Sequence, residues 1–458
     1  MKLTSSILIL GAMISLAYSA SRASELRVGA AAVNLAADDS MVITGGIQPG
    51  RAKGQEGELR ATAVVVEKPG QGKVAIVSCD VLLVTARDVQ PALKEIEKQT
   101  GIAPDHVMVS ATHTHHAPST ARFHGYDRDE KFCRTLREGI VRAVVEANKR
   151  LSDKDAAADL LFHLGEENTI GGNSRRLLDD GQIWWIGRAN FVKPTGPFDP
   201  QLPVIGFRGP GKDASGDQWR AVLYGHSTHT IGTRRGGVRS PSFYGLAAQE
   251  LEEPLGATVG FLEGASGSTH NIGGVLTDEA VRRLKVAVNQ SLRKAERQRV
   301  ARVVSVKQPF RFTVRKFDEE TEDAKVERYC RKYDPRGADS TVGVFRTMRK
   351  MLAPDQGKER QTVIQAIVLG DVALVGVPAE FFTVFGLEIK KRSPVKHTVI
   401  VELANDAIGY LPDREAHKLG GYQTWMGLHS FAEIGTGERM ADEAVKLLEE
   451  IQREMKDE

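Results

Sequence analysis

Strand-like and helix-like segments alternate through the first half of the chain, and this alternation is what most constrains the fold. Residues 73–84 form an apolar run typical of a buried strand, and residues 86–100 have the spacing of an amphipathic helix. A second strand is expected over residues 106–110 and a long helix over residues 131–151. This spacing predicts an α/β (or α+β) layered sandwich.

The second half of the chain continues the alternation. We expect strands over residues 219–226, 257–262 and 397–403, a pair of short strands around Gly370 and Asp371, and helices over residues 244–253, 277–294 and 438–454. Residues 319–337 are highly charged and end in Pro335 and Gly337, which predicts an exposed insertion or lid. Because there is no internal repeat or long flexible linker, we expect one domain over residues 25–458.

The first 24 residues have the pattern of a secretory signal peptide. Lys2 is followed by an apolar run over residues 7–16 and then by small residues. The run is too short to serve as a stable bilayer anchor. We therefore expect residues 1–24 to be a signal peptide and the mature protein to be secreted or periplasmic.

Charge and cysteine content argue against two classes of protein. The formal net charge is +3 and no dense block of Lys and Arg is present, so nucleic acid is not expected as a partner. Cys79, Cys133 and Cys330 are an odd set without CxxC spacing. The sequence therefore indicates neither a disulfide framework nor a cysteine-based metal site.

The segment SATHTHHAPS, residues 110–119, holds three histidines in four positions just after an expected strand. In an extended backbone, His113 and His115 project to the same face, where both imidazoles can approach one ion. His116 projects to the other face and has no expected role. The motif alone leaves two interpretations open, a metal site and a solvated polar loop.

A second histidine motif, GHSTHT, follows the strand expected over residues 219–226. His226 ends that strand, so we expect it to face His113 across the strand ends. His229 comes three residues later, and we expect it to lie next to the metal ligands without binding the metal, or at the protein surface. Two or three histidines with a carboxylate would suit zinc, whose catalytic sites keep one position open for water.

Three further candidates lie in loops that follow later strands. Glu380 comes directly after an apolar strand and Pro378, which suits a ligand, although a carboxylate near a helix N-terminus also stabilises that helix. Tyr410 and Tyr422 lie in a Gly-rich loop, where aromatic residues most often pack. Residues 264–271, GASGSTHN, lack the final glycine of GxSxG, so no nucleophile elbow is expected.

Taken together and in this order, five motifs resemble the neutral/alkaline (non-lysosomal) ceramidase family. The motifs are THTH, GHSTHT, FLEGASGSTHN, GDVALVGVPAE and the N-x4-Y…GGY loop. The resemblance runs from about Leu26 to the end of the chain. It implies a zinc amidase that cleaves the N-acyl bond of sphingolipids. The family's immunoglobulin-like C-terminal domain is not expected here.

The resemblance also assigns roles to residues. It implies that the zinc ligands are His113, His226, Glu380 and Tyr410. His115 matches the second histidine of the HTH motif beside the metal, where it is a candidate acid or base. Tyr422 matches a tyrosine that polarises the scissile amide, and Arg175, with Arg176 as the alternative, matches an arginine of the site.

The chain departs from the family at the nucleophile. His270 stands where the family has its active serine, with Ser268 nearby. We therefore expect direct attack by metal-activated water rather than a covalent route, with His270 as a base or a further ligand.

We expect a secreted zinc-dependent hydrolase of an amide, with a small-molecule or lipid N-acyl substrate and transient contact with a membrane surface. The alternatives are a related metal hydrolase of another amide or ester, and a non-catalytic secreted binding protein of the same fold. The sequence gives no expectation for the oligomeric state.

Overall fold

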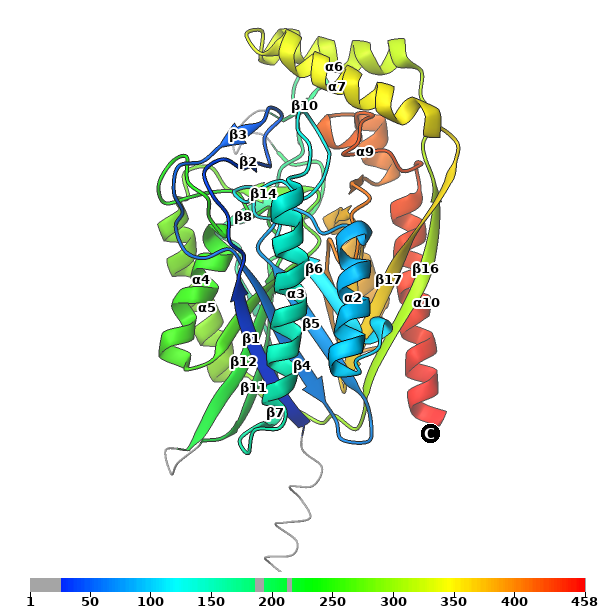
Figure 1. Cartoon of the computed structure of the whole chain (residues 1–458). Coiled ribbons are helices and arrows are strands. Elements are labelled where there is room, and N and C mark those ends of the chain that lie inside the picture. The colour runs from blue at the N-terminus through cyan, green and yellow to red at the C-terminus, as the bar shows by residue number, and fades with distance from the viewer. Residues whose placement is uncertain (1–25, 186–192, 212–215, 458) are drawn as a thin grey trace, which may run out of the picture.

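Two β-sheets packed face to face form the centre of the protein (Figure 1). A computed structural model describes residues 26–185, 193–211 and 216–457. The signal peptide expected over residues 1–24 lies outside the described residues. None of the helices within these ranges combines the length and apolar character needed to cross a membrane.

The first sheet has nine strands and is mixed. In spatial order its strands are β13 (Thr258–Glu263), β12 (Asp217–His226), β11 (Gln201–Pro210), β7 (Ala157–Glu166), β1 (Leu26–Asn34), β4 (Arg60–Glu67), β5 (Lys73–Cys79) and β6 (Val107–Ala111), with β15 (Glu296–Gln298) beside β7. The pairs β5–β6 and β12–β13 are parallel. The carboxyl ends of β6 and β12 come close together, since His113 and His229, which follow these strands, are in contact.

The second sheet has four strands, β16 (Val303–Thr313), β17 (Glu359–Leu369), β18 (Val372–Gly376) and β20 (His397–Val401). Along β4, alternate side chains enter different layers because successive residues of a strand face opposite sides. Val64 and Val66 pack in the core between the sheets, whereas Ala63 and Val65 pack beneath the helices. Burial on both faces explains why residues 63–66 of this strand are continuously apolar.

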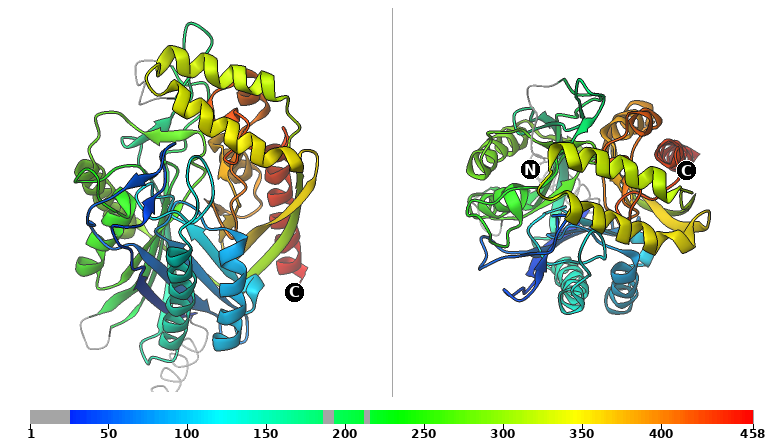
Figure 2. Two further views of the ribbon diagram at one scale, coloured as in Figure 1. Left: turned by 45° about the horizontal axis from the view of Figure 1, so that its top comes forward. Right: turned by 90° about the horizontal axis from the view of Figure 1, so that it is seen from above.

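Helices cover the outer faces of both sheets (Figures 1 and 2). The first sheet is covered by α2 (Ala86–Thr100), α3 (Glu130–Arg150), α4 (Ser242–Leu255) and α5 (Thr277–Lys294). The second is covered by α8 (Thr383–Arg392) and α10 (Thr436–Asp457). The layered α/β sandwich expected from the sequence is confirmed.

A helical hairpin lies across the top of the sandwich (Figure 2). It consists of α6 (Glu319–Tyr333) and α7 (Ala338–Leu352), so most of the charged segment over residues 319–337 forms a helix. Short elements complete this end of the protein: β2 (Val42–Ile43), β3 (Gly50–Arg51), β8 (Gly171–Asn173), β9 (Arg176–Leu177), β10 (Ile183–Trp184), β14 (Thr269–Asn271), β19 (Glu380–Phe381), β21 (Tyr410–Leu411), α9 (Arg414–Leu419), η1 (Pro104–His106), η2 (Ala353–Asp355) and η3 (Tyr422–Thr424). Part of residues 264–271 forms a strand, because β14 pairs with β8.

Candidate metal and catalytic site

The candidate site lies where strands of both sheets end. His113 follows β6 and His229 follows β12. Glu380 and Tyr410 follow β18 and β20 of the second sheet and lie opposite each other in the separate parallel pair β19–β21. Neighbouring ends of the two packed sheets therefore bring together residues that are far apart in the sequence.

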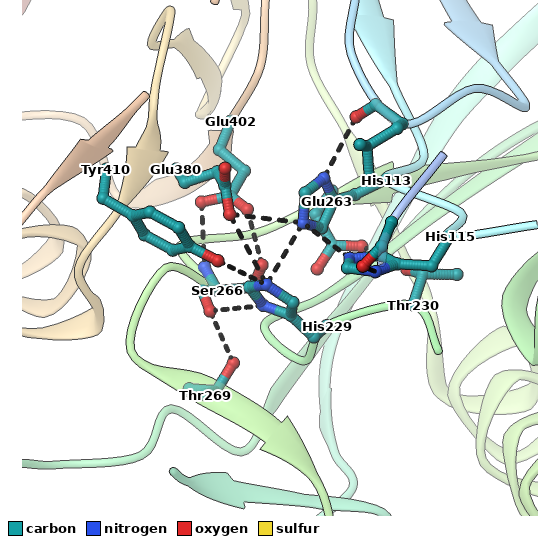
Figure 3. A network of polar contacts seen from close by, with 12 residues as sticks. His113, His115, His229, Thr230, Glu263, Ser266, Thr269, Glu380, Glu402 and Tyr410 are labelled. Carbon is teal, nitrogen blue, oxygen red and sulfur yellow. Dashed lines mark hydrogen bonds and ion pairs between the residues drawn. The ribbon is translucent and has the colours of Figure 1, made fainter. Parts of the chain in front are cut away.

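Three imidazoles point toward one another at this position (Figure 3). The Nε2 atom of His113 lies 3.2 Å from Nε2 of His229 and 3.4 Å from Nε2 of His115. Each Nδ1 atom instead faces a backbone carbonyl oxygen. Nδ1 of His113 lies 3.0 Å from that of Leu82, Nδ1 of His115 lies 3.1 Å from that of Gly45, and Nδ1 of His229 lies 3.0 Å from that of Ser266.

These contacts fix which nitrogen of each ring carries hydrogen. A carbonyl oxygen only accepts, so each Nδ1 donates, and each neutral imidazole presents the lone pair of Nε2 to the others. Facing lone pairs repel one another unless a cation lies between them. The same second hydrogen bond orients metal-binding histidines in general. His113, His115 and His229 can therefore bind a metal ion.

A buried carboxylate completes the cluster. Oε2 of Glu380 lies 3.4 Å from Nε2 of His113 and 3.5 Å from Nε2 of His229. This oxygen is buried and has no hydrogen-bond partner among the described residues. Leaving a buried charged oxygen without a hydrogen bond is costly, so its position also fits a bound cation. The Tyr410 hydroxyl lies 3.1 Å from Nε2 of His229.

The environment favours the protonation states that a metal requires at Glu380, His115 and His229. At His113 it does not, because burial would lower the pKa of this imidazole but Glu380 raises it above its usual value. Burial alone would raise the pKa of Glu380, but His113 and His229 lower it below its usual range. Burial lowers the pKa of His115 and His229. An ionised carboxylate and neutral imidazoles are the forms that coordinate metal ions.

Glu402, which the sequence did not single out, connects the two halves of the site. Its Oε2 accepts hydrogen bonds from the backbone N–H groups of Ser266 and Phe381, both at 2.9 Å. Ser266 holds Nδ1 of His229, and Phe381 follows Glu380 directly. Glu402 therefore positions one histidine and one carboxylate at once.

The structure does not bring His226 into the cluster, contrary to the expectation that it is a ligand. Its Nε2 lies 2.8 Å from the carbonyl oxygen of Glu167, and its Nδ1 contacts the hydroxyl of Tyr244. His226 lies on the face of β12 that packs against α4, so it points away from the sandwich edge. His229, expected in the surroundings or at the surface, is buried in the cluster instead.

Arg175 and Ser268 are also turned away from the imidazoles. The guanidinium of Arg175 donates to the carbonyl oxygens of Gly420 and Ala416, at 2.6 and 3.1 Å, and to Gln423 at 2.9 Å. It therefore holds the loop before Tyr422 rather than facing the cluster. The hydroxyl of Ser268 lies 3.1 Å from that of Thr383. Arg176, the alternative arginine, lies in β9, outside the cluster.

A cavity of about 210 Å³ opens beside the imidazoles. His115, His229, His270, Tyr410 and Tyr422 line it, so the structure brings these residues together around one space. Its aromatic wall is completed by Trp184 and by Trp185, whose ring is stacked on Tyr422 with centres 4.6 Å apart.

His124, a lone loop histidine with no signal in the sequence, also lines the cavity. Its Nδ1 lies 3.1 Å from the carbonyl oxygen of Gly46, so Nδ1 carries the hydrogen and Nε2 accepts. The Tyr422 hydroxyl, 2.9 Å from that Nε2, is then the donor. The hydrogen of Tyr422 points to His124, and its oxygen lone pairs remain for a ligand.

Comparison with solved structures identifies the architecture. Neutral ceramidase from Pseudomonas aeruginosa superimposes with a TM-score of 0.72 at 19% identity, over 93% of this chain and 75% of that one. A structure described as ceramidase complexed with C2 gives 0.71 at 17% identity, over 94% and 76%. No family model and no curated protein sequence matches the chain. Both structures are of ceramidases, the first a neutral ceramidase, and this chain has their fold.

Proposed function

We propose that the protein is a secreted zinc-dependent amidase that hydrolyses an N-acyl substrate of the ceramide type. The observation that carries the proposal is the convergence of the Nε2 lone pairs of His113 and His229 with one buried carboxylate oxygen of Glu380, beside a cavity that His115 lines. The shared fold with neutral ceramidases supports the reaction class.

The donor set supports zinc as the metal. Ligands held about 2.0–2.1 Å from a tetrahedral zinc ion are roughly 3.3–3.4 Å apart. His113, His229 and Glu380 have mutual separations of 3.2, 3.4 and 3.5 Å between their facing atoms. Tyr410, beside His229, is our proposed fourth ligand. Bound zinc supplies a water of lowered pKa and polarises the substrate carbonyl.

We assign His115 to proton transfer. His115 lines the cavity, whereas His113 and Glu380 are not among the residues that line it. Its Nδ1 hydrogen is held by Gly45, and its lowered pKa keeps Nε2 free to accept a proton. His270 lies on the same cavity wall as His229, with ring centres 6.0 Å apart, where it can contact the substrate.

We assign Tyr422 a different role from the one that the family resemblance implies. Because its hydrogen is donated to His124, its oxygen accepts rather than donates. An amide substrate has an N–H group that can donate to it, and an ester does not. This arrangement favours amides over esters as substrates.

The size of the cavity favours one alternative, a small polar amide in place of a long-chain ceramide. Pockets that enclose a drug-sized ligand usually measure roughly 300–1,000 Å³, against about 210 Å³ here. A long acyl chain would therefore have to extend beyond the cavity. N-acetyl- and N-palmitoyl-sphingosine, compared with a simple N-acyl amine, distinguish the two substrate classes.

Metal content tests the proposed ligand set directly. Loss of a group that only hydrogen-bonds to a metal ligand lowers metal affinity roughly 10–100-fold. We expect His229→Ala, which removes a ligand itself, to weaken zinc binding by more than this. His226→Ala is the matched control, which should retain zinc at one per folded chain even if it is less stable. Zinc retained by His229→Ala and lost by His226→Ala would overturn the assignment. Zinc bound at full occupancy without turnover of any amide would instead favour a binding protein.

A further inference from the structure

A second cavity, of about 460 Å³, adjoins the turn that carries Tyr422. Five of its lining side chains are cationic: Arg315, Lys316, Lys325, Arg328 and Lys418. Glu322 is the acidic side chain among the described lining residues. We refer to this space, bounded by these five cations, as the basic cavity.

Most of the positive charge in the basic cavity is not neutralised by the protein. Lys325 pairs with Glu322 at 2.6 Å, and Lys418 pairs with Glu415 at 3.0 Å. The second pair is 74% and 64% exposed, so it contributes little. The cations without an ion pair within the described part of the chain are Arg315, Lys316 and Arg328.

Arg315 is the least exposed of the five cations, and its contacts are with neutral acceptors. Its guanidinium donates to Nδ1 of His417 at 3.1 Å and to the carbonyl oxygen of Thr424 at 2.9 Å. Burial lowers the pKa of Arg315, and burial together with the charge of Arg315 lowers the pKa of His417 to about 3. A cation in such surroundings is stabilised by any anion that enters.

We propose that the basic cavity binds a phosphate group, either free or as part of an ester. A doubly charged oxyanion matches an excess of cations that a single carboxylate would not neutralise. Arginine and lysine are the side chains that bind phosphate most readily, arginine through its planar fork and lysine as a point charge. The exposed Lys316, Lys325 and Arg328 line an entrance that an ion can reach from solvent.

The basic cavity and the catalytic cavity share one short turn. Gly421 and Thr424 line the basic cavity, whereas Tyr422 and Gln423 line the catalytic cavity. Arg315 is bonded to this turn through Thr424. A phosphate that draws on the donors of Arg315 therefore acts on the position of Tyr422. This effect on turnover rests on the proposed amidase function, whereas phosphate binding itself does not.

Calorimetric titration with inorganic phosphate at constant ionic strength tests the binding. We expect saturable binding that weakens about tenfold or more in Lys316→Ala/Arg328→Ala, because two charge-assisted contacts are removed. Lys94→Ala/Lys149→Ala is the matched control, since it removes the same charge from exposed positions on α2 and α3. It should bind phosphate like the unmodified chain.

The metal site is the competing location for phosphate, and His229→Ala distinguishes it. Binding that survives His229→Ala and is lost in Lys316→Ala/Arg328→Ala supports the basic cavity. The opposite result, or no saturable binding, overturns the proposal. A failure of the amidase assay leaves either binding result intact, so the two proposals fail separately.

Vesicles identify the source of the phosphate group. Phosphatidylcholine vesicles with phosphatidic acid are compared with phosphatidylcholine alone. Binding to the former that inorganic phosphate displaces, and that Lys316→Ala/Arg328→Ala abolishes, supports a lipid headgroup. Phosphate binding without vesicle binding supports a free phosphate. Vesicle binding that neither phosphate nor the double variant weakens would contradict the proposed site.

Discussion

The hydrogen bond between Tyr422 and His124 decides which way a hydroxyl of the catalytic cavity is oriented. In His124→Leu the hydroxyl loses its acceptor and turns into the cavity. We expect kcat/KM for an amide to fall about 10- to 100-fold, the usual scale for misplacing one group of an active site. The change should lie mainly in kcat, measured by steady-state kinetics on N-acyl substrates.

A double-mutant cycle separates this role from a general loss of packing. Tyr422→Phe removes the same hydrogen bond from the other side, so the two effects should not add in His124→Leu/Tyr422→Phe. His124→Gln keeps an acceptor and should recover part of the activity. Fully additive losses would show that His124 and Tyr422 act independently.

The choice between His226 and His229 shows what residue types alone could and could not predict. The motif GHSTHT correctly indicated a histidine of the site, but we expected His226 as the ligand, and the structure places His229 in the cluster instead. Along β12, Tyr224 and His226 share the face toward α4, while Leu223 faces the core between the sheets. Strict alternation places the last strand residue on the outer face, and only the turn after it brings His229 inward.

At the scale of elements, helices with a strong hydrophobic periodicity were predictable from the sequence. Short strands that form only by pairing with a distant segment were not. The helices expected over residues 86–100 and 277–294 match α2 and α5 to the residue. By contrast, β14 forms only through its pairing with β8, about 100 residues earlier in the chain, and no local pattern encodes such pairing. The same holds for β19 and β21, which place Glu380 opposite Tyr410.

The α6–α7 hairpin is held by a buried arginine, which gives an element-scale prediction. Arg349 of α7 is 0% exposed and donates to Glu319 at 2.8 Å and Asp323 at 2.6 Å, both on α6. Arg349→Met leaves both carboxylates without this donor. We expect the free energy of unfolding to fall by about 1–3 kcal/mol, since the acidic partners are partly exposed.

Hydrogen exchange shows where that loss occurs. Amides of α6 and α7 should exchange faster in Arg349→Met, while those of β5 should not. Arg346→Met is the control on the same helix, because Arg346 is 53% exposed and its ion pair should contribute no more than about 1 kcal/mol. Equal effects of the two substitutions would contradict a special role for the buried arginine.

At the scale of the whole molecule, one buried acid makes stability depend on pH. Asp80 lies just after β5, and its carboxylate accepts hydrogen bonds from the backbone of Arg60 at 3.0 Å and from Thr112 at 3.2 Å. These bonds do not offset the loss of solvent, and burial raises the pKa of Asp80 to about 7. In the unfolded chain the same group titrates near its ordinary value of about 3.9.

Because the folded state binds this proton more tightly, between about pH 4 and pH 7 it holds more protons than the unfolded state. Stability must then fall as pH rises through this window, by up to about 4 kcal/mol, and level off above it. Asp80→Asn removes the titration, so the difference in free energy of unfolding between variant and unmodified chain should grow steadily from pH 4 to pH 7. Taking the difference cancels the titration of the metal site, which both proteins share. Denaturant unfolding curves at each pH measure this difference in the free energy of unfolding. Parallel pH profiles of the two proteins would contradict the prediction, because they would show that Asp80 is already ionised in the folded protein at pH 4.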